Sequence, residues 1–137
     1  MTARRATLLP VFVAAAATLT LPGCGSDPSY ARTSPGRIAV RLSEYRITPG
    51  FLQVRAGRVR IDARNTGRVT HNVAVVQFKR SLASQDERIY GKPTQTLFPG
   101  QTGYTTVTLK PGKYRIVCTI ANHDNLGQYG ELKVTAK

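Results

Sequence analysis

Apolar and polar residues alternate along much of the chain after residue 37. Ile38, Val40 and Leu42 occupy every second position, and the residues between them are small or polar. A period of two is typical of a strand with one buried face. Similar short apolar runs follow at 52–54, 59–63, 73–78, 104–109, 114–118 and 132–134. The pattern predicts about seven to eight short strands.

Turn-forming residues separate these runs. They are Pro49-Gly50, Asn65-Thr66-Gly67, Pro99-Gly100 and Pro111-Gly112. Gly, Pro and Asn favour tight turns, and short strands joined by turns predict an all-β fold, an antiparallel β-sandwich. The stretch 79–96 has no clear period, although residues 81–89 are compatible with a turn or two of helix.

The first 23 residues have the pattern of a secretory signal. Arg4-Arg5 precede an apolar run over 8–21, and Cys24 follows. The run is interrupted by Pro10 and is shorter than the ~20 residues of a spanning helix. Its end resembles the lipobox of bacterial lipoproteins, which implies cleavage before Cys24, acylation of Cys24 and a lipid-anchored, extracytoplasmic location. Acyl chains on one residue can anchor a protein to a membrane.

The segment after the signal predicts a linker and then one domain. Residues 24–36 lack an apolar period and contain two prolines, so we expect the lipidated cysteine to be followed by a flexible linker. Residues 37–137 have the length of a single domain with one core. We expect this domain to be a monomer.

The chain is strongly basic. Its formal net charge is +13, and cleavage before Cys24 removes Arg4 and Arg5, leaving +11. This balance favours an acidic protein partner or an anionic membrane surface. Nucleic acid is not expected as a partner, because the basic residues stand singly, as Arg58, Arg60 and Arg64 do, whereas a nucleic-acid-binding face clusters its charge.

Candidate chemistry comes from one cysteine and the only two histidines. Acylation of Cys24 would leave Cys118 without a disulfide partner, and a free thiol outside the cytoplasm is expected to be buried or bound. Cys118 could be a small core residue. His123, however, follows it by five positions, and His71 opens an earlier strand. One thiolate and two imidazoles are the trigonal donor set of electron-transfer copper sites, so we predict one bound copper ion.

The residues around these donors resemble the copper-binding pattern of the cupredoxin family. Asn65-Thr66-Gly67 precedes His71-Asn72, and residues 111–130 read Pro-Gly-x-Tyr-x3-Cys-x4-His-x4-Gln-x-Gly. The resemblance covers residues 38–137, and the second motif is its most specific part. It implies a Greek-key β-sandwich with a mononuclear blue-copper site.

The resemblance also implies roles for neighbouring residues. Gln128 stands where the commonest cupredoxin pattern has an axial methionine, and Met1 is the only methionine of the chain. Stellacyanin-like members use a glutamine oxygen there, which implies Gln128 as the fourth ligand. The alternative is that Gln128 faces solvent and the site has three ligands. The backbone of Asn72 is implied as a hydrogen-bond donor to the cysteine sulfur, and loop residue His123 as the ligand nearest the surface.

The predicted function is one-electron transfer through copper cycling between Cu(I) and Cu(II), with a redox protein as partner and no enzymatic activity. One alternative is an extracytoplasmic copper carrier or storage protein that uses the same ligands. Another is a zinc-dependent hydrolase with Asp124 or Glu131 as the base. The absence of Met-rich and His-rich tracts favours electron transfer over copper handling.

Overall fold

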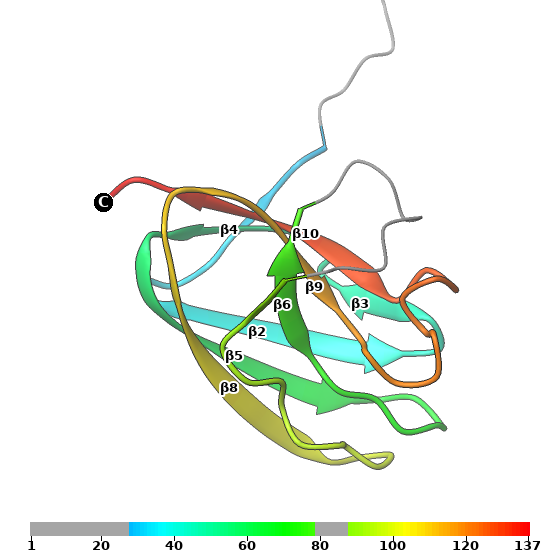
Figure 1. Cartoon of the computed structure of the whole chain (residues 1–137). Helices are drawn as coiled ribbons and strands as arrows, with labels where there is room; N and C mark the ends of the chain where they lie inside the picture. Colours follow the sequence, from blue (N-terminus) through cyan, green and yellow to red (C-terminus); the bar gives the residue numbers. More distant parts are fainter. Residues whose placement is uncertain (1–27, 79–87) are drawn as a thin grey trace, which may run out of the picture.

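Two sheets make up the part of the chain that the computed structural model describes, residues 28–78 and 88–137 (Figure 1). The six-stranded sheet has the order β1 (Ala31–Arg32), β4 (Phe51–Arg55), β10 (Tyr129–Thr135), β9 (Gly112–Val117), β6 (Ala74–Gln77) and β7 (Ile89–Tyr90). The four-stranded sheet has the order β3 (Arg46–Thr48), β2 (Arg37–Ser43), β5 (Gly57–Asn65) and β8 (Thr102–Leu109). The predicted all-β sandwich is confirmed, and eight of its strands have three or more residues.

The expectation of a purely antiparallel sandwich is wrong. β2 pairs with β5, and β4 pairs with both β1 and β10, in parallel. The chain leaves the four-stranded sheet at β4 and returns to it at β5, so β5 lies beside β2 and runs in the same direction. Of the stretch without a clear period, Ile89–Tyr90 form β7, and residues 79–87 lie outside the described residues.

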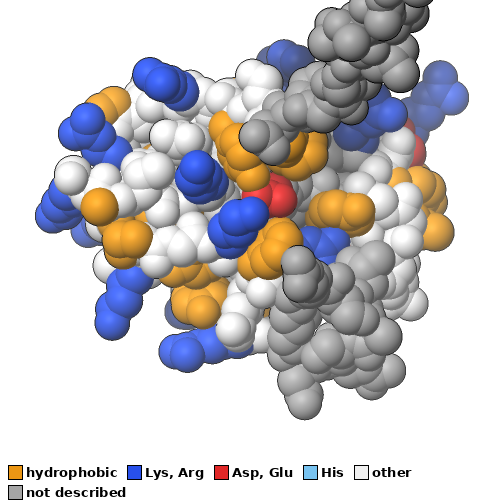
Figure 2. Space-filling model, turned by 90° about the horizontal axis from the view of Figure 1, so that it is seen from above, with side chains coloured by type: hydrophobic (Ala, Val, Ile, Leu, Met, Phe, Trp, Pro, Cys, Tyr) orange, Lys and Arg blue, Asp and Glu red, His pale blue; other side chains and the backbone are white. Residues whose placement is uncertain are grey.

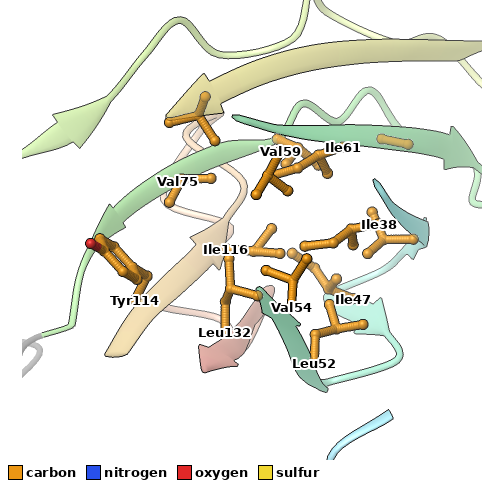
Figure 3. Packing of buried hydrophobic residues seen from close by; sticks show 14 of the residues in the cluster. Ile38, Ile47, Leu52, Val54, Val59, Ile61, Val75, Tyr114, Ile116 and Leu132 are labelled. Carbon is orange, nitrogen blue, oxygen red and sulfur yellow. The ribbon is translucent and has the colours of Figure 1, made fainter. Parts of the chain in front are cut away.

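The core lies between the two sheets, as Figure 3 shows. The alternation predicted for β2 is present, because Ile38, Val40 and Leu42 are buried and the residues between them are exposed. Burying an aliphatic side chain of this size contributes roughly 1.5–3 kcal/mol. Among the described residues, all buried members of the main cluster lie between Ile38 and Val134.

The ordered domain begins earlier than the predicted boundary at residue 37. Ala31–Arg32 form β1 on the edge of β4, and the Thr33 amide donates to Gln53 O at 3.2 Å. The Tyr30 ring packs edge-on against Phe51, and its hydroxyl donates to Glu131. An edge strand presents unpaired backbone groups, and β1 satisfies those of β4. This pairing has no apolar period, which is why these residues read as linker.

Neither described range contains a helix with the length and apolarity of a membrane span. The outer face of the six-stranded sheet carries interspersed hydrophobic and basic side chains, as Figure 2 shows from this side. The Arg115 guanidinium lies over the Tyr129 ring at 4.0 Å, for example. The strand ends that carry the loops before β6 and after β9 meet at one end of the sandwich, where the candidate site lies.

Candidate metal centre

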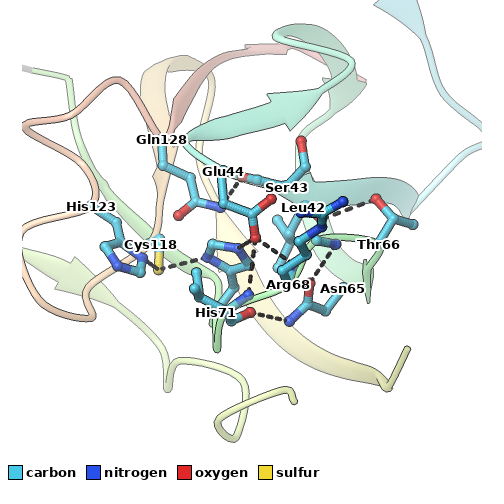
Figure 4. Close-up of polar contacts among 12 residues, drawn as sticks. Leu42, Ser43, Glu44, Asn65, Thr66, Arg68, His71, Cys118, His123 and Gln128 are labelled. Carbon is cyan, nitrogen blue, oxygen red and sulfur yellow. Dashed lines mark hydrogen bonds and ion pairs between the residues drawn. The ribbon is translucent and has the colours of Figure 1, made fainter. Parts of the chain in front are cut away.

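Three predicted ligands converge at this end of the sandwich. His71, Cys118 and His123 each offer one donor atom, and the three atoms lie within 4.8 Å of one another (Figure 4). Cys118 Sγ is 4.0 Å from His71 Nδ1 and 3.6 Å from His123 Nδ1. All three residues are buried. The structure therefore brings together two imidazoles and one thiol from segments nearly fifty residues apart.

The turn after β5 positions His71. The Asn65 side chain is buried there, and its amide group donates to Val69 O at 2.7 Å and to Leu97 O at 2.9 Å. Its side-chain oxygen accepts the Gly67 amide at 2.9 Å, which is the local bond that favours Asn in turns. His71 and Leu97 then exchange two backbone hydrogen bonds. Both the amide and the carbonyl group of His71 are thus hydrogen-bonded to Leu97.

Glu44, in the turn between β2 and β3, is a site residue that sequence reasoning missed. Its Oε1 lies 3.7 Å from His71 Nε2, the ring nitrogen that does not face Cys118. The same carboxylate accepts the backbone amides of Arg68 and of Val69, the latter at 2.9 Å. These amide bonds lower the pKa of Glu44 to about 2, so the group is anionic at neutral pH.

The carboxylate lies beside one nitrogen of the His71 ring, within ion-pair distance but without a hydrogen bond. A metal-ligating histidine commonly directs its other nitrogen towards a carboxylate or carbonyl, which fixes the tautomer. With Nε2 facing Glu44, the lone pair of Nδ1 is available on the side of Cys118. Burial lowers the pKa of His71, the neighbouring His123 lowers it further, and Glu44 opposes both. No sequence signal connects an acidic residue in one hairpin with a histidine 27 positions later.

The loop after β9 holds the other donors. The Cys118 amide donates to Gln128 O at 3.2 Å, and the Gln128 amide donates to His123 O at 2.9 Å. The loop turns sharply at Ala121 and Asn122, whose φ angles are 47° and 56°. His123 is 7% exposed, against 0% for His71, so it is the histidine closer to solvent, as predicted. Its ring packs edge-on against Tyr45, with centroids 5.0 Å apart.

Asn72 connects the segment that contains His71 with the loop that begins at Cys118. Its backbone amide donates to Cys118 Sγ at 3.5 Å, which is the hydrogen bond expected from the sequence. Its side chain also donates to Thr119 Oγ1 and accepts the Thr119 amide, both at 2.8 Å. Burial raises the pKa of the Cys118 thiol, and the Asn72 amide acts in the opposite direction by stabilising the thiolate.

Gln128 is fully buried, so the alternative in which it faces solvent is wrong. Its side-chain nitrogen donates to Ser43 O at 2.9 Å. Its side-chain oxygen is also buried and makes no hydrogen bond of normal geometry with the described residues, although an interaction of this side chain with His71 partly opposes the lowering of the pKa of that histidine by burial. A buried amide oxygen normally has a partner, because leaving it unsatisfied costs roughly 1–3 kcal/mol. An acceptor of this kind is suited to a metal ion.

The donor set fits copper better than a hydrolytic zinc site. Two histidines and one cysteine, with a weak fourth oxygen, are typical of electron-transfer copper sites. Neither Asp124 nor Glu131, the candidate bases, belongs to the cluster that the described residues form. Glu131 instead accepts the Tyr30 hydroxyl and lies 3.6 Å from Lys113 Nζ.

Comparison with known proteins supports the same assignment of fold. No protein-family profile matches the chain, and no curated protein is similar to it in sequence. An auracyanin from Roseiflexus castenholzii superposes with a TM-score of 0.62 at 21% identity, covering 73% of this chain and 97% of its own. Auracyanin A from Chloroflexus aurantiacus, described as a blue copper protein, gives 0.61 at 22%, covering 74% and 100%. The chain has the cupredoxin fold.

Rusticyanin shares this cupredoxin fold. Its reduced form superposes on this chain with a TM-score of 0.53 at 20% identity, covering 76% of this chain and 83% of its own. A rusticyanin variant with glutamine in place of a methionine gives 0.56 at 24%, covering 77% and 82%. The donor cluster described above therefore lies in a cupredoxin-like sandwich.

Proposed function

We propose that the chain binds one copper ion through His71, Cys118 and His123 and transfers single electrons. The observation that carries this proposal is the convergence of the three donor atoms within 4.8 Å in a buried site. The blue copper protein with the same fold supports it. A copper ion held by these residues supplies a one-electron couple between Cu(II) and Cu(I).

The protein's part is to hold one arrangement of donors for both oxidation states. His71 is fixed by its backbone bonds to Leu97, and Cys118 Sγ by the amide of Asn72. The buried oxygen of Gln128 is the proposed fourth donor. It is harder than a thioether and favours Cu(II), so it lowers the reduction potential relative to a methionine. His123, the more exposed histidine, is the proposed route for the electron to the surface.

Copper storage or delivery uses the same ligands and is the second candidate. A carrier must release its ion readily, whereas here His71 and Cys118 are 0% exposed. The amide of Asn72, the residue after His71, also donates a hydrogen bond to Cys118 Sγ. Burial of this kind favours retention of the ion and therefore electron transfer. A hydrolase is not supported, because no carboxylate joins the donor cluster in the described residues.

The experiment is a copper-loaded absorption and paramagnetic resonance spectrum of residues 25–137, compared with Cys118→Ser. We expect intense visible absorption from the thiolate-to-copper transition, and its loss in the variant. Loss of a partner that only orients a ligand costs 10–100-fold in metal affinity, so loss of the thiolate ligand should cost more than about 100-fold. A colourless protein that binds zinc and hydrolyses substrates would contradict the proposal.

We further propose that the domain lies outside the cytoplasm on a lipid anchor at Cys24. The support is the pattern of residues 1–24, which lie outside the described residues. Lipid labelling in a bacterial host should mark the wild-type chain and leave Cys24→Ser unlabelled. The net charge of +11 after cleavage supports an acidic redox protein as the partner of a monomeric domain.

A further inference from the structure

The outer face of the four-stranded sheet gathers arginine side chains. Buried and outward positions alternate along its strands, and the outward positions carry six arginines and no lysine. These residues, which we call the arginine face, are Arg37, Arg41, Arg46, Arg58, Arg60 and Arg64. They stand singly in the sequence, but the period of two places them all on one side of adjacent strands. The premise that the basic residues do not cluster is therefore wrong.

The positive charge of this face is largely uncompensated. Asp62 is the only acidic residue among the outward positions, and it pairs with Arg37 at 2.7 Å and Arg60 at 2.9 Å. The other four arginines make no ion pair with any described residue. Arg41 and Arg64 even stand directly opposite each other in the β2–β5 register. Like charges on neighbouring strands repel one another, and an uncompensated positive face attracts external anions.

We propose that the arginine face docks on an anionic lipid surface. Basic side chains near such a surface each add about fivefold to binding. The face offers little of the apolar area that protein interfaces usually bury, because Tyr104 is its one aromatic side chain and the Arg60 guanidinium lies over that exposed ring at 3.8 Å. A broad array of positive charge with a single aromatic side chain is complementary to a layer of phosphate headgroups.

Nucleic acid fits this face less well. A sheet of four strands spaced about 4.8 Å apart is roughly 15 Å wide, which exceeds the ~12 Å major groove of DNA. Single strands need a row of exposed aromatic rings for base stacking, and Tyr104 is the only aromatic residue among the outward positions. Phosphates arranged in a plane remain the best complement.

The proposed lipid anchor, which precedes β1 at the edge of the six-stranded sheet, keeps the domain close to a lipid surface. Only six residues separate Cys24 from Ala31, the start of β1. Fully extended, this segment spans about 25 Å, so an anchored domain stays near the headgroups. Weak electrostatic contacts are then sufficient to orient it. This step rests on the proposed anchor, whereas the charge of the face does not.

Docking in this way leaves the candidate metal centre accessible. Cys118 and His123 lie at the end of β9 and in the loop beyond it, not on the outer face of either sheet. If the domain rests on its arginine face, this end of the sandwich faces sideways, parallel to the membrane surface, and is not covered by lipid. Lipid docking and electron exchange therefore use different surfaces.

The test is vesicle flotation with residues 25–137, which contain every core residue that the structure describes and lack both Cys24 and the predicted signal. The vesicles contain 30% phosphatidylglycerol and 70% phosphatidylcholine, or phosphatidylcholine alone, in 0.1 M salt. The variant is Arg41→Gln, Arg58→Gln and Arg64→Gln together. We expect the wild type to bind only the anionic vesicles, and the variant to bind them on the order of a hundredfold more weakly.

A matched control removes the same charge from the other sheet, through Arg55→Gln, Lys113→Gln and Lys133→Gln. These residues are exposed on the six-stranded sheet. The charges on the two outer faces are separated by the ~10 Å between the sheets and by the side chains on each side, about two Debye lengths of ~10 Å, so we expect only about a twofold loss. Circular dichroism spectra of both variants should match the wild type and so establish that they are folded. Equal losses in the two variants, absence of binding to anionic vesicles, or tighter binding of a DNA duplex would each overturn the proposal.

The same experiment keeps this inference separate from copper binding. The arginine face contains none of the donor residues, so apo and copper-loaded protein should bind vesicles equally. Failure of the protein to bind copper, with vesicle binding intact, would count only against the proposed function. Absence of vesicle binding together with a normal copper spectrum would count only against lipid docking through the arginine face.

Discussion

The candidate metal centre has two halves that are built differently. What we call the strand half, Glu44 between β2 and β3 with His71 and Asn72 just before β6, is held by long-range bonds to separate parts of the fold. The loop half, Cys118 to Gln128, is one continuous segment held largely by bonds within itself. The strand half supplies a fixed, fully buried imidazole, and the loop half supplies the thiol and the histidine nearest to solvent.

The difference indicates that the two halves of the site have separate roles. A site that must keep one geometry in two oxidation states benefits from a rigid support, and several independent bonds provide it on the strand side. A site that must also exchange electrons needs one ligand near the surface, and the loop provides it. The following variants test whether the two halves have these separate roles.

Glu44→Gln should have the largest effect of the four, through the strand half. The variant keeps an acceptor of similar shape but removes the charge that faces His71 Nε2. Loss of such an orienting partner typically costs 10–100-fold in metal affinity, which competition with a copper chelator would measure. Glu131→Gln, which changes a carboxylate outside the donor cluster, is the control. Equal affinities of Glu44→Gln and wild type would refute the role of Glu44.

Asn72→Ala should uncouple the halves. It removes two side-chain hydrogen bonds to Thr119 while the backbone amide that donates to Cys118 Sγ remains. At about 0.5–1.5 kcal/mol each, their loss should lower the free energy of unfolding of the apoprotein by roughly 1–3 kcal/mol in urea titrations. Asn125→Ala, in the loop itself, should change it by less than about 0.5 kcal/mol. Equal effects of the two variants would show that Asn72 does not connect the halves.

Gln128→Met tests the fourth donor of the loop half. Replacing the buried oxygen with a softer thioether should favour Cu(I) and raise the reduction potential. A tenfold change in the ratio of Cu(II) to Cu(I) affinity corresponds to 59 mV, which is the scale expected in protein-film voltammetry. Gln53→Met, a half-buried position on β4, serves as the control and should leave the potential unchanged. An unchanged or lowered potential in Gln128→Met would argue against axial ligation.

Tyr45→Leu should have the smallest effect. The ring packs edge-on against His123, and such contacts contribute about 0.5–1.5 kcal/mol. We expect unfolding to become easier by about this amount while the reduction potential stays the same. Phe98→Leu is the control, because Phe98 is exposed and makes no ring contact with another described residue. A large shift in potential would mean that Tyr45 acts on the ligand geometry.

Much of the site could be predicted from residue types and spacing. The motif over 111–130 identified Cys118, His123 and Gln128, and the scarcity of histidine left His71 as the remaining imidazole. The structure brings the first two together with His71 and buries Gln128, and the hydrogen bond from Asn72 to the sulfur is present. Ligation of copper by these residues stays a prediction. Glu44 could not be found in this way, because its role depends on how one hairpin packs beside a distant turn.

Prediction of the fold from the sequence meets the same limit. Alternation identified most strands, since the period of two records which side chains are buried. It could not identify β1, whose contribution is backbone pairing at an exposed edge. Nor could it specify the parallel pairing of β2 with β5, because pairing partners depend on how the chain crosses between the sheets.

By itself, the sequence determined the all-β class, most of the strands and the residues able to bind a metal ion, because periodicity and donor chemistry are local properties. Only the tertiary structure decided which distant side chains meet. It placed Glu44 beside His71, buried the side chain of Gln128, and collected isolated arginines on one face. The physical reason is that contacts between distant segments arise from packing the two sheets together, and no short stretch of chain records that packing.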